Sequence, residues 1–426
     1  MKPKPQKLKN GMSIIFVPQA GASSMTLLVL VKVGSRYETR EINGASHFIE
    51  HLMFKGTKRR PNTQIISREL DRYGAEYNAY TDKDVTGYYI KMDARRTSLA
   101  VDMLHDMLFH SLYAPKEINR ERGVIIEEIN MYEDNPRAHV EDLLEAALFP
   151  NSTLGWNIAG PREIIRSVTR AQLLRYRDAY YLPERMTIVV AGKLVPGLMA
   201  LLHKTFGSVQ RRGGQDHAFD PFCLPASAAH PVCGYQEKNT EQTQIALAFH
   251  GLQLGHDDLA AASLLATILG GSMSSRLFIQ VRERRGLCYS ISAGHQARED
   301  SGTFSILAGL AKTRVHEAAC VIYDELNKIA KARVTSEELR RAKDHIRGRT
   351  MLAFENSAAQ AEWYGKQWLF QRRIETLEER MERFELVTAA EIQRVAKNIF
   401  HKDRMATALI GPFGRLDAAG KVLTWK

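Results

Sequence analysis

The chain of 426 residues has no long uninterrupted run of apolar residues. The longest strongly apolar stretch covers residues 25–31 and is followed by Lys32, far short of the ~18 residues that a membrane-spanning helix needs. The basic segment at residues 1–10 also lacks the apolar core of a secretory signal. We therefore expect a protein without a membrane span, located in the cytoplasm.

Cysteine is scarce, and its spacing is irregular. The four cysteines show no Cys-x-x-Cys pattern, which argues against a structural zinc site built from thiolates. They are also too few for a disulfide framework in a chain of this size. We expect reduced thiols at Cys223, Cys233, Cys288 and Cys320.

Charge of one sign is in excess but is not concentrated. The net charge is +11, yet 48 acidic residues are interspersed among the 59 basic ones, and no run of five basic residues occurs. A solvated basic surface explains this balance, and no nucleic-acid recognition motif is present. Nucleic-acid binding remains an alternative that only the charge favours, and we expect no nucleic-acid partner.

The sequence contains an internal repeat. Residues 168–171 (Val-Thr-Arg-Ala) return as residues 387–390 (Val-Thr-Ala-Ala), and residues 184–186 (Glu-Arg-Met) return as residues 403–405 (Asp-Arg-Met) at the same offset of 219. Each copy predicts a helix capped by threonine, then an apolar strand that ends at glycine. Self-similarity at a fixed offset indicates two homologous halves.

The two halves define the expected domain organisation. We expect a first half at residues 1–209, a linker at 210–232 that is rich in glycine, proline and polar residues, and a second half at 233–426. Adjacent strands followed by several helices favour an α+β fold for each half. In the first half the pattern predicts strands at 13–17, 25–33 and 87–92 and helices at 44–55, 63–73, 94–110, 115–135, 139–148 and 169–181.

The pattern His-Phe-Ile-Glu-His at residues 47–51 carries the clearest chemistry. On a helix, positions i and i+4 lie one above the other, so His47 and His51 can offer both imidazoles to one metal ion. Glu50 lies on the same face and can reach a metal-bound water without being a ligand. This order of residues is the inverzincin signature of zinc peptidases.

A catalytic zinc with two histidine ligands needs a third protein ligand. The charged helix at residues 115–135 offers several carboxylates. Glu121 and Glu128 are two helical turns apart and share a face, whereas Glu127 points about 100° away from Glu128. Spacing alone leaves the choice among these carboxylates open, and one of them could instead support a histidine.

Residues 44–57 (Gly-Ala-Ser-His-Phe-Ile-Glu-His-Leu-Met-Phe-Lys-Gly-Thr) resemble the active-site helix of the pitrilysin-type zinc metallopeptidases, in particular the bacterial members similar to mitochondrial processing peptidase. The resemblance extends over nearly the whole chain. It implies one zinc ion per chain with the ligands His47, His51 and Glu128. It also implies that Glu50 is the catalytic base and that Glu121 is an additional acidic residue beside the ligands.

The resemblance assigns further residues. Residues 74–81 match the segment before the edge strand that binds the substrate backbone, which implies that Asn78 and Ala79 contact substrate. Arg282 and Tyr289 match an arginine–tyrosine pair that contacts substrate and stabilises the reacting carbonyl. A surface arginine beside a half-buried aromatic residue is the simpler interpretation of these two residues by themselves.

The second half lacks the metal residues. Residues 259–271, where the metal helix should recur, contain neither histidine nor glutamate, and the counterpart of Glu128 is Gly348. The second half is therefore expected to be a degenerate copy without a metal.

The resemblance implies a zinc-dependent endopeptidase that hydrolyses peptides or unfolded polypeptide segments. Each half should contain a mainly antiparallel sheet packed with helices. In relatives of this length two chains close around a clam-like chamber, so this chain should supply half of the enclosure. Because both the metal residues and the arginine–tyrosine pair are present, we expect a homodimer; a heterodimer with a non-catalytic relative is the alternative. The rival function is that of a non-catalytic scaffold subunit of the same family.

Overall fold

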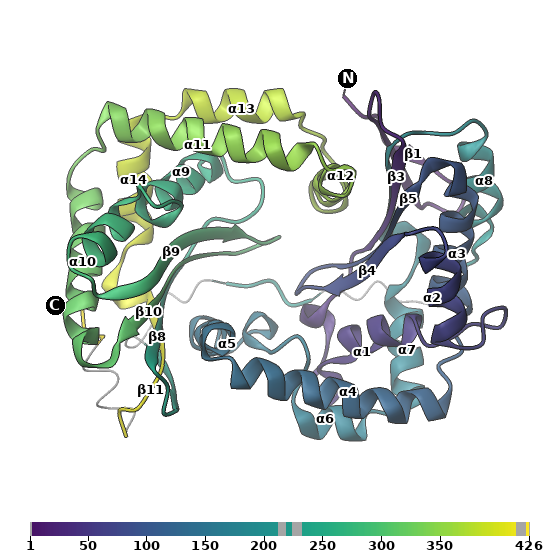
Figure 1. The fold of residues 1–426 in the computed structure, drawn as a ribbon, viewed down its shortest axis with the longest axis horizontal. Helices are drawn as coiled ribbons and strands as arrows, with labels where there is room; N and C mark the ends of the chain where they lie inside the picture. Colours follow the sequence, from purple (N-terminus) through teal and green to yellow (C-terminus); the bar gives the residue numbers. More distant parts are fainter. Residues whose placement is uncertain (1, 212–218, 224–231, 415–422, 426) are drawn as a thin grey trace. The chain divides into compact units, whose positions relative to one another are not determined.

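The computed structural model describes residues 2–211, 219–223, 232–414 and 423–425, and these form two compact units (Figure 1). Neither unit is continuous in sequence. The first holds Met1–Ile129, Trp156–Phe219 and Met351–Thr376, and the second holds Asn130–Gly155, Asp220–Thr350 and Leu377–Lys426. Most of the linker expected at 210–232 lies outside the described residues.

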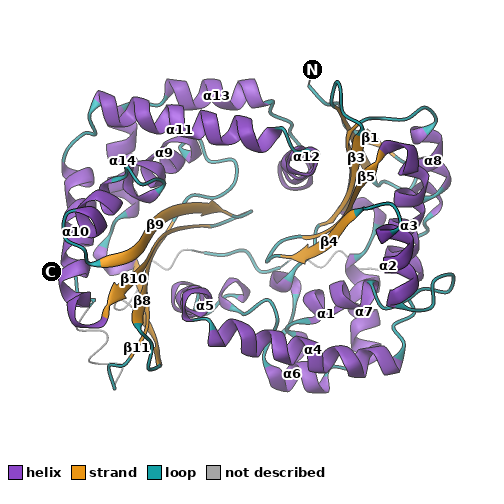
Figure 2. Cartoon of the chain, viewed as in Figure 1, coloured by secondary structure: helices purple, strands orange, loops and turns teal. Residues whose placement is uncertain are grey.

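The sheet of the first unit is drawn in orange on the right of Figure 2. It has six strands in the order β1-β2-β6-β3-β5-β4. Only β2 and β6 run parallel; the other neighbours are antiparallel. The strands are β1 (Gln6–Lys7), β2 (Ser13–Pro18), β3 (Ser24–Val31), β4 (Glu76–Thr81), β5 (Thr86–Asp93) and β6 (Met186–Gly192). The helices are α1 (Ala45–Met53), α2 (Thr63–Asp71), α3 (Thr97–His110), most of α4 (Pro115–Asp134), α6 (Arg162–Ser167), α7 (Arg170–Tyr180), α8 (Leu198–Lys204) and α12 (Ser357–Gln371).

The second unit repeats this arrangement, and its described residues include no counterpart of β1. Its sheet has the order β7-β11-β8-β10-β9, and only β7 and β11 are parallel. The strands are β7 (Val232–Glu237), β8 (Gln242–His250), β9 (Cys288–Ala297), β10 (Gly302–Ala311) and β11 (Met405–Gly411). The helices are α5 (Pro136–Leu148), α9 (Leu259–Gly270), α10 (Val315–Lys331), most of α11 (Ser336–Phe354), α13 (Leu377–Leu386) and α14 (Ala389–Ile399).

The internal repeat is visible in matching elements. Thr169 and Thr388 each form a capping box, with Gln172 and Glu391 respectively, at the start of α7 and α14. Each of these helices leads into the strand, β6 or β11, that joins a parallel and an antiparallel neighbour. The expected α+β class with two homologous halves is confirmed.

Both faces of each sheet are covered, and one covering helix comes from the other half of the sequence. Side chains alternate along β3, so Leu27 and Val29 join the core beneath α1, α3 and α7, whereas Leu28 and Leu30 pack with α12. In the second unit, α5 covers Ala246 and its neighbours on β8 and β11. Helix α5 thus belongs to the first half of the sequence but to the second unit, and α12 belongs to the second half but to the first unit. The two helices are exchanged between the halves, and each follows a long charged helix.

The predicted strands and helices of the first half are present, with ends shifted by a few residues. One expectation is wrong. Residues 76–81 do not precede the edge strand; they are the edge strand, β4, whose one described partner is β5. Exposed Glu76 and Asn78 alternate with the more buried Tyr77 and Ala79, which is the pattern of a strand with one covered face.

All four cysteines are unpaired, as the sequence predicts. Among the described residues, no helix combines the length and the apolar character needed to cross a membrane.

Candidate metal centre

Helix α1 presents the residues of the metal motif on its less buried face. Phe48, Ile49, Leu52 and Met53 are fully or almost fully buried in the core, while the side chains at 47, 50 and 51 remain partly accessible. The apolar positions therefore fix the rotation of the helix and turn both imidazoles to the same side.

A buried carboxylate holds the start of α1. Gly44 stands before the helix with φ of 98° and offers no side-chain cap. Glu38 takes this part instead, because its Oε2 accepts from the Gly44 amide at 2.7 Å and its Oε1 accepts from the Ser46 amide at 2.7 Å. The Asn43 side-chain amide donates to the same carboxylate at 2.9 Å. Glu38 thereby satisfies amides that the first helical turn leaves without partners.

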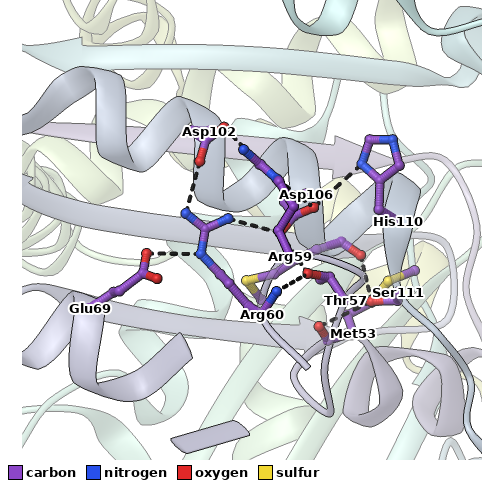
Figure 3. A network of polar contacts seen from close by, with 10 residues as sticks. Met53, Thr57, Arg59, Arg60, Glu69, Asp102, Asp106, His110 and Ser111 are labelled. Atoms are coloured by element: carbon purple, nitrogen blue, oxygen red, sulfur yellow. Dashed lines mark hydrogen bonds and ion pairs between the residues drawn. The ribbon is translucent and has the colours of Figure 1, made fainter. Parts of the chain in front are cut away.

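The segment after α1 is held by a second buried carboxylate, Asp106 of α3 (Figure 3). It accepts from the Thr57 hydroxyl at 2.7 Å and from Nη1 of Arg60 at 2.8 Å. Arg60 also pairs with Asp102 and Glu69, each at 2.8 Å. The loop that leaves α1 is thus tied to both α3 and α2.

His47, His51 and Glu128 converge. The Nε2 atoms of His47 and His51 lie 3.3 Å apart. Oε2 of Glu128 lies 3.5 Å from Nε2 of His47 and 3.4 Å from Nε2 of His51. Ligands about 2.0–2.1 Å from a tetrahedral zinc ion would be separated by roughly 3.3–3.4 Å. Within the part of the chain that the structure describes, this is the one such group of three ligand atoms. The donor set and its spacing fit a zinc ion.

The two imidazoles differ in proton affinity. Burial, together with the neighbouring His51, lowers the pKa of His47 to about 4, so this ring is neutral near pH 7 and able to ligate. Burial also disfavours the charged form of His51, but hydrogen bonds to Glu121 and Glu128 outweigh it and raise the pKa of His51 to about 9. Binding of a metal ion would therefore release a proton from His51.

Glu121 supports His51 from behind. Its Oε2 lies 3.1 Å from Nδ1 of His51, and its Oε1 lies 2.8 Å from the Lys55 ammonium. Glu121 is 1% exposed, whereas Glu127 is exposed and takes no part in the ligand group. A carboxylate at Nδ1 fixes the tautomer that leaves Nε2 free to ligate.

Glu50 lies beside the ligands without joining them. Burial raises the pKa of its carboxyl, although a hydrogen bond from Thr81 acts in the opposite direction. The Thr81 hydroxyl donates to Oε2 of Glu50 at 2.5 Å. The sequence does not predict a role for four further residues that support the centre: Glu38, Lys55, Thr81 and Asp106. Each acts through a contact that the local sequence pattern does not reveal.

Asn78 and Ala79 lie on the edge strand β4. They pair with Tyr89 and Tyr88 of β5, and the Asn78 side chain accepts from the Ala79 amide at 2.9 Å. Asn78 is exposed and Ala79 is buried.

Arg282 and Tyr289 belong to the second unit, where they are neighbours. The Arg282 guanidinium lies 5.4 Å from the centre of the Tyr289 ring, and Tyr289 is 70% exposed. Arg282 lies in the helical turn Phe278–Glu283, and Tyr289 lies at the start of β9. The metal residues, by contrast, belong to the first unit.

Helix α9, which stands in the second unit where the metal helix should recur, carries no histidine or glutamate. This helix carries only small or apolar residues besides one serine and one threonine, and most of them are buried. Gly348, the counterpart of Glu128, is exposed on α11 with no atom near the place of a side chain. Arg276 forms two hydrogen bonds with Glu338 at 2.7 and 2.9 Å and so supports the start of α11.

Comparisons with known proteins identify the family. Residues 14–162 match the description "Insulinase (Peptidase family M16)", and residues 167–346 match "Peptidase M16 inactive domain". An uncharacterized zinc protease of Bacillus subtilis is 36% identical over 96% of this chain and 98% of its own length. One from Streptomyces coelicolor is 33% identical over 95% of this chain and 88% of its own length. The chain belongs to peptidase family M16, which confirms the resemblance to pitrilysin-type enzymes.

Solved structures share the fold. A protease from Helicobacter pylori matches with a TM-score of 0.89 at 23% identity, over 96% of this chain and 99% of that one. A putative M16-like peptidase from Alicyclobacillus acidocaldarius matches with a TM-score of 0.84 at 18% identity, over 96% of this chain and 98% of that one.

Proposed function

We propose that this chain is a zinc-dependent endopeptidase that hydrolyses peptides or unfolded polypeptide segments. The observation that carries the proposal is the convergence of His47, His51 and Glu128 at distances suited to one zinc ion, with the Glu50 carboxylate beside them. The zinc proteases among its relatives support the choice of metal.

The residues of the centre have distinct roles in this proposal. His47, His51 and Glu128 would hold one zinc ion per chain, and Glu121 would orient His51. Zinc bound there would supply a Lewis acid that polarises a water molecule and the scissile carbonyl. Glu50 would take a proton from the attacking water and pass it to the leaving amine. A raised carboxyl pKa suits this task, because a general base works best when its pKa is near the working pH.

The substrate would bind along β4. The far side of this strand from β5 has no partner strand among the described residues, so an extended peptide could add to the sheet beside Asn78 and Ala79. This mode relies on backbone hydrogen bonds and tolerates varied sequences.

Arg282 and Tyr289 would complete the site by donating hydrogen bonds to the oxyanion that develops on the substrate. We propose that they act on a substrate held by the partner chain of a homodimer, with each chain enclosing part of a chamber. The exposure of Tyr289 beside Arg282 supports their availability to another molecule. A heterodimer with a non-catalytic relative is the alternative.

These roles assign the metal site to one half of the chain. We propose residues 1–209 as the metal-binding half and 233–426 as the metal-free half, joined by the linker at 210–232.

We propose the cytoplasm as the location, which agrees with four unpaired thiols.

Cleavage of a mixed library of unstructured peptides tests the function. Wild-type protein should cut peptides, and a zinc chelator should abolish the cuts. Glu50→Gln should keep about one zinc per chain, measured by atomic absorption, yet lose activity by about 100- to 10,000-fold, the contribution of a general base. Undiminished cleavage by Glu50→Gln would remove Glu50 from its role. A wild-type chain that binds no zinc and cuts nothing would favour the scaffold function.

A further inference from the structure

One hydrogen bond joins the base to the edge strand. The Thr81 hydroxyl donates to Oε2 of Glu50 at 2.5 Å. Thr81 is the last residue of β4, whereas Glu50 lies on α1. The strand and the helix pack against each other, so tertiary packing brings together two side chains that are 31 residues apart.

The orientation of Glu50 matters for the proposed chemistry. A glutamate side chain has several rotatable bonds and loses considerable freedom when it is fixed. A misplacement of about 1 Å at a reacting group can lower a rate by roughly 100-fold. Threonine is a suitable anchor, because branching at Cβ makes its χ1 angle stiff and because pairing with Thr86 of β5 fixes its backbone.

We infer that Thr81 is a positioning residue for the catalytic base, an inference that rests on the proposed peptidase function. Its hydroxyl holds Oε2 of Glu50 and leaves Oε1 to receive the proton of the attacking water. Thr81 is not a member of the ligand group, and it would act on the reaction through Glu50. Because β4 is also the strand along which the peptide would add, the element that receives the substrate also orients the base.

Three substitutions test this role. Thr81→Val keeps the shape and the strand preference but removes the hydroxyl. Thr81→Ser keeps the hydroxyl. Thr205→Val is the matched control, because it makes the same change at a hydroxyl outside β4 and the ligand group, which donates to the Leu201 carbonyl at 2.8 Å rather than to Glu50.

The first measurement is steady-state cleavage of a peptide that the wild-type protein cuts. Thr81→Val should lower kcat by about 10- to 100-fold, the usual cost of losing a supporting hydrogen bond at a catalytic centre, with KM within about twofold of wild type. Thr81→Ser should recover most of the loss, and Thr205→Val should match wild type. An unchanged kcat in Thr81→Val, or equal losses in Thr81→Val and Thr81→Ser, would overturn the inference.

The second measurement needs no activity, so it separates this inference from the proposed function. Crystal structures of the variants should show the Glu50 carboxylate displaced in Thr81→Val and in its original place in Thr81→Ser and Thr205→Val. A carboxylate that keeps its place in Thr81→Val contradicts the inference whether or not the protein cleaves peptides. A wild-type protein without peptidase activity contradicts the proposed function, and the displacement then still decides what Thr81 does to Glu50.

Discussion

Glu121 shows how one buried side chain prepares another. It is the residue that holds Nδ1 of His51, and Lys55 balances its charge. The corresponding Nδ1 atom of His47 is buried and has no hydrogen-bond partner among the described residues. The orientation of the imidazole pair therefore depends more on Glu121 than on any other carboxylate that does not ligate.

Removing this charge should weaken zinc binding. Glu121→Gln keeps the shape of the side chain but loses the charge-assisted hydrogen bond to His51, and support of this kind is worth about 10- to 100-fold in metal affinity. Competition with a chromophoric zinc chelator measures the change. Glu127→Gln, an exposed position on the same helix, serves as the control and should bind zinc like wild type. Equal affinities in the two variants would assign Glu121 a purely structural role.

Residues with a regular spacing could be predicted, and those with distant partners could not. The spacing of residues 47–51 predicts two imidazoles and a carboxylate on one helical face because all three belong to one helix. Spacing restricts the third ligand only to a few carboxylates of α4, because the choice among them depends on how α4 packs against α1. Thr81 lies in the matched segment 74–81, but nothing local assigns it a role of its own, because its importance comes from a contact with Glu50 on another element.

Helix α1 is held at both ends by buried carboxylates, and this makes it a fixed platform for the two histidines. Glu38 binds the amides at its start, and Asp106 binds the loop after its end through Thr57 and Arg60. The sequence predicts the helix but not these anchors, since neither carboxylate lies within the helix itself. The sequence also does not predict the edge strand β4, because polar Glu76 and Asn78 interrupt its apolar residues.

Removing the anchor after α1 should destabilise the first unit. Asp106→Ala leaves Arg60 partly buried with one fewer carboxylate partner, and breaking a buried ion pair in this way costs about 3–5 kcal/mol of unfolding free energy. Asp102→Ala removes a neighbouring carboxylate that is 38% exposed and should cost less than about 1 kcal/mol. Urea unfolding followed by circular dichroism compares the two. Equal losses would show that the burial of Asp106 adds nothing to its contribution.

At the scale of the whole molecule, the proposed homodimer combines a metal centre from one chain with Arg282 and Tyr289 from the other. Two inactive variants should therefore complement each other. Glu50→Gln and Arg282→Ala chains, unfolded together and refolded in equal amounts, should form mixed dimers with one complete site and recover about one quarter of wild-type activity if chains pair at random. Each variant refolded alone is the control. Mixed dimers that form, as shown by mass spectrometry, but remain inactive would place both groups on the same chain.

The exchange of α5 and α12 bears on the ancestry of the protein. In each unit, the helix that covers one face of the sheet comes from the other sequence repeat. A primitive chain with a single repeat could have shielded that face by borrowing the helix of a second copy. In that case, pairing of identical chains would have preceded the gene duplication, and fusion would have turned an intermolecular swap into an intramolecular one. Once the two copies were joined, one could lose its ligands without loss of folding, because the swap requires only its helix and its sheet.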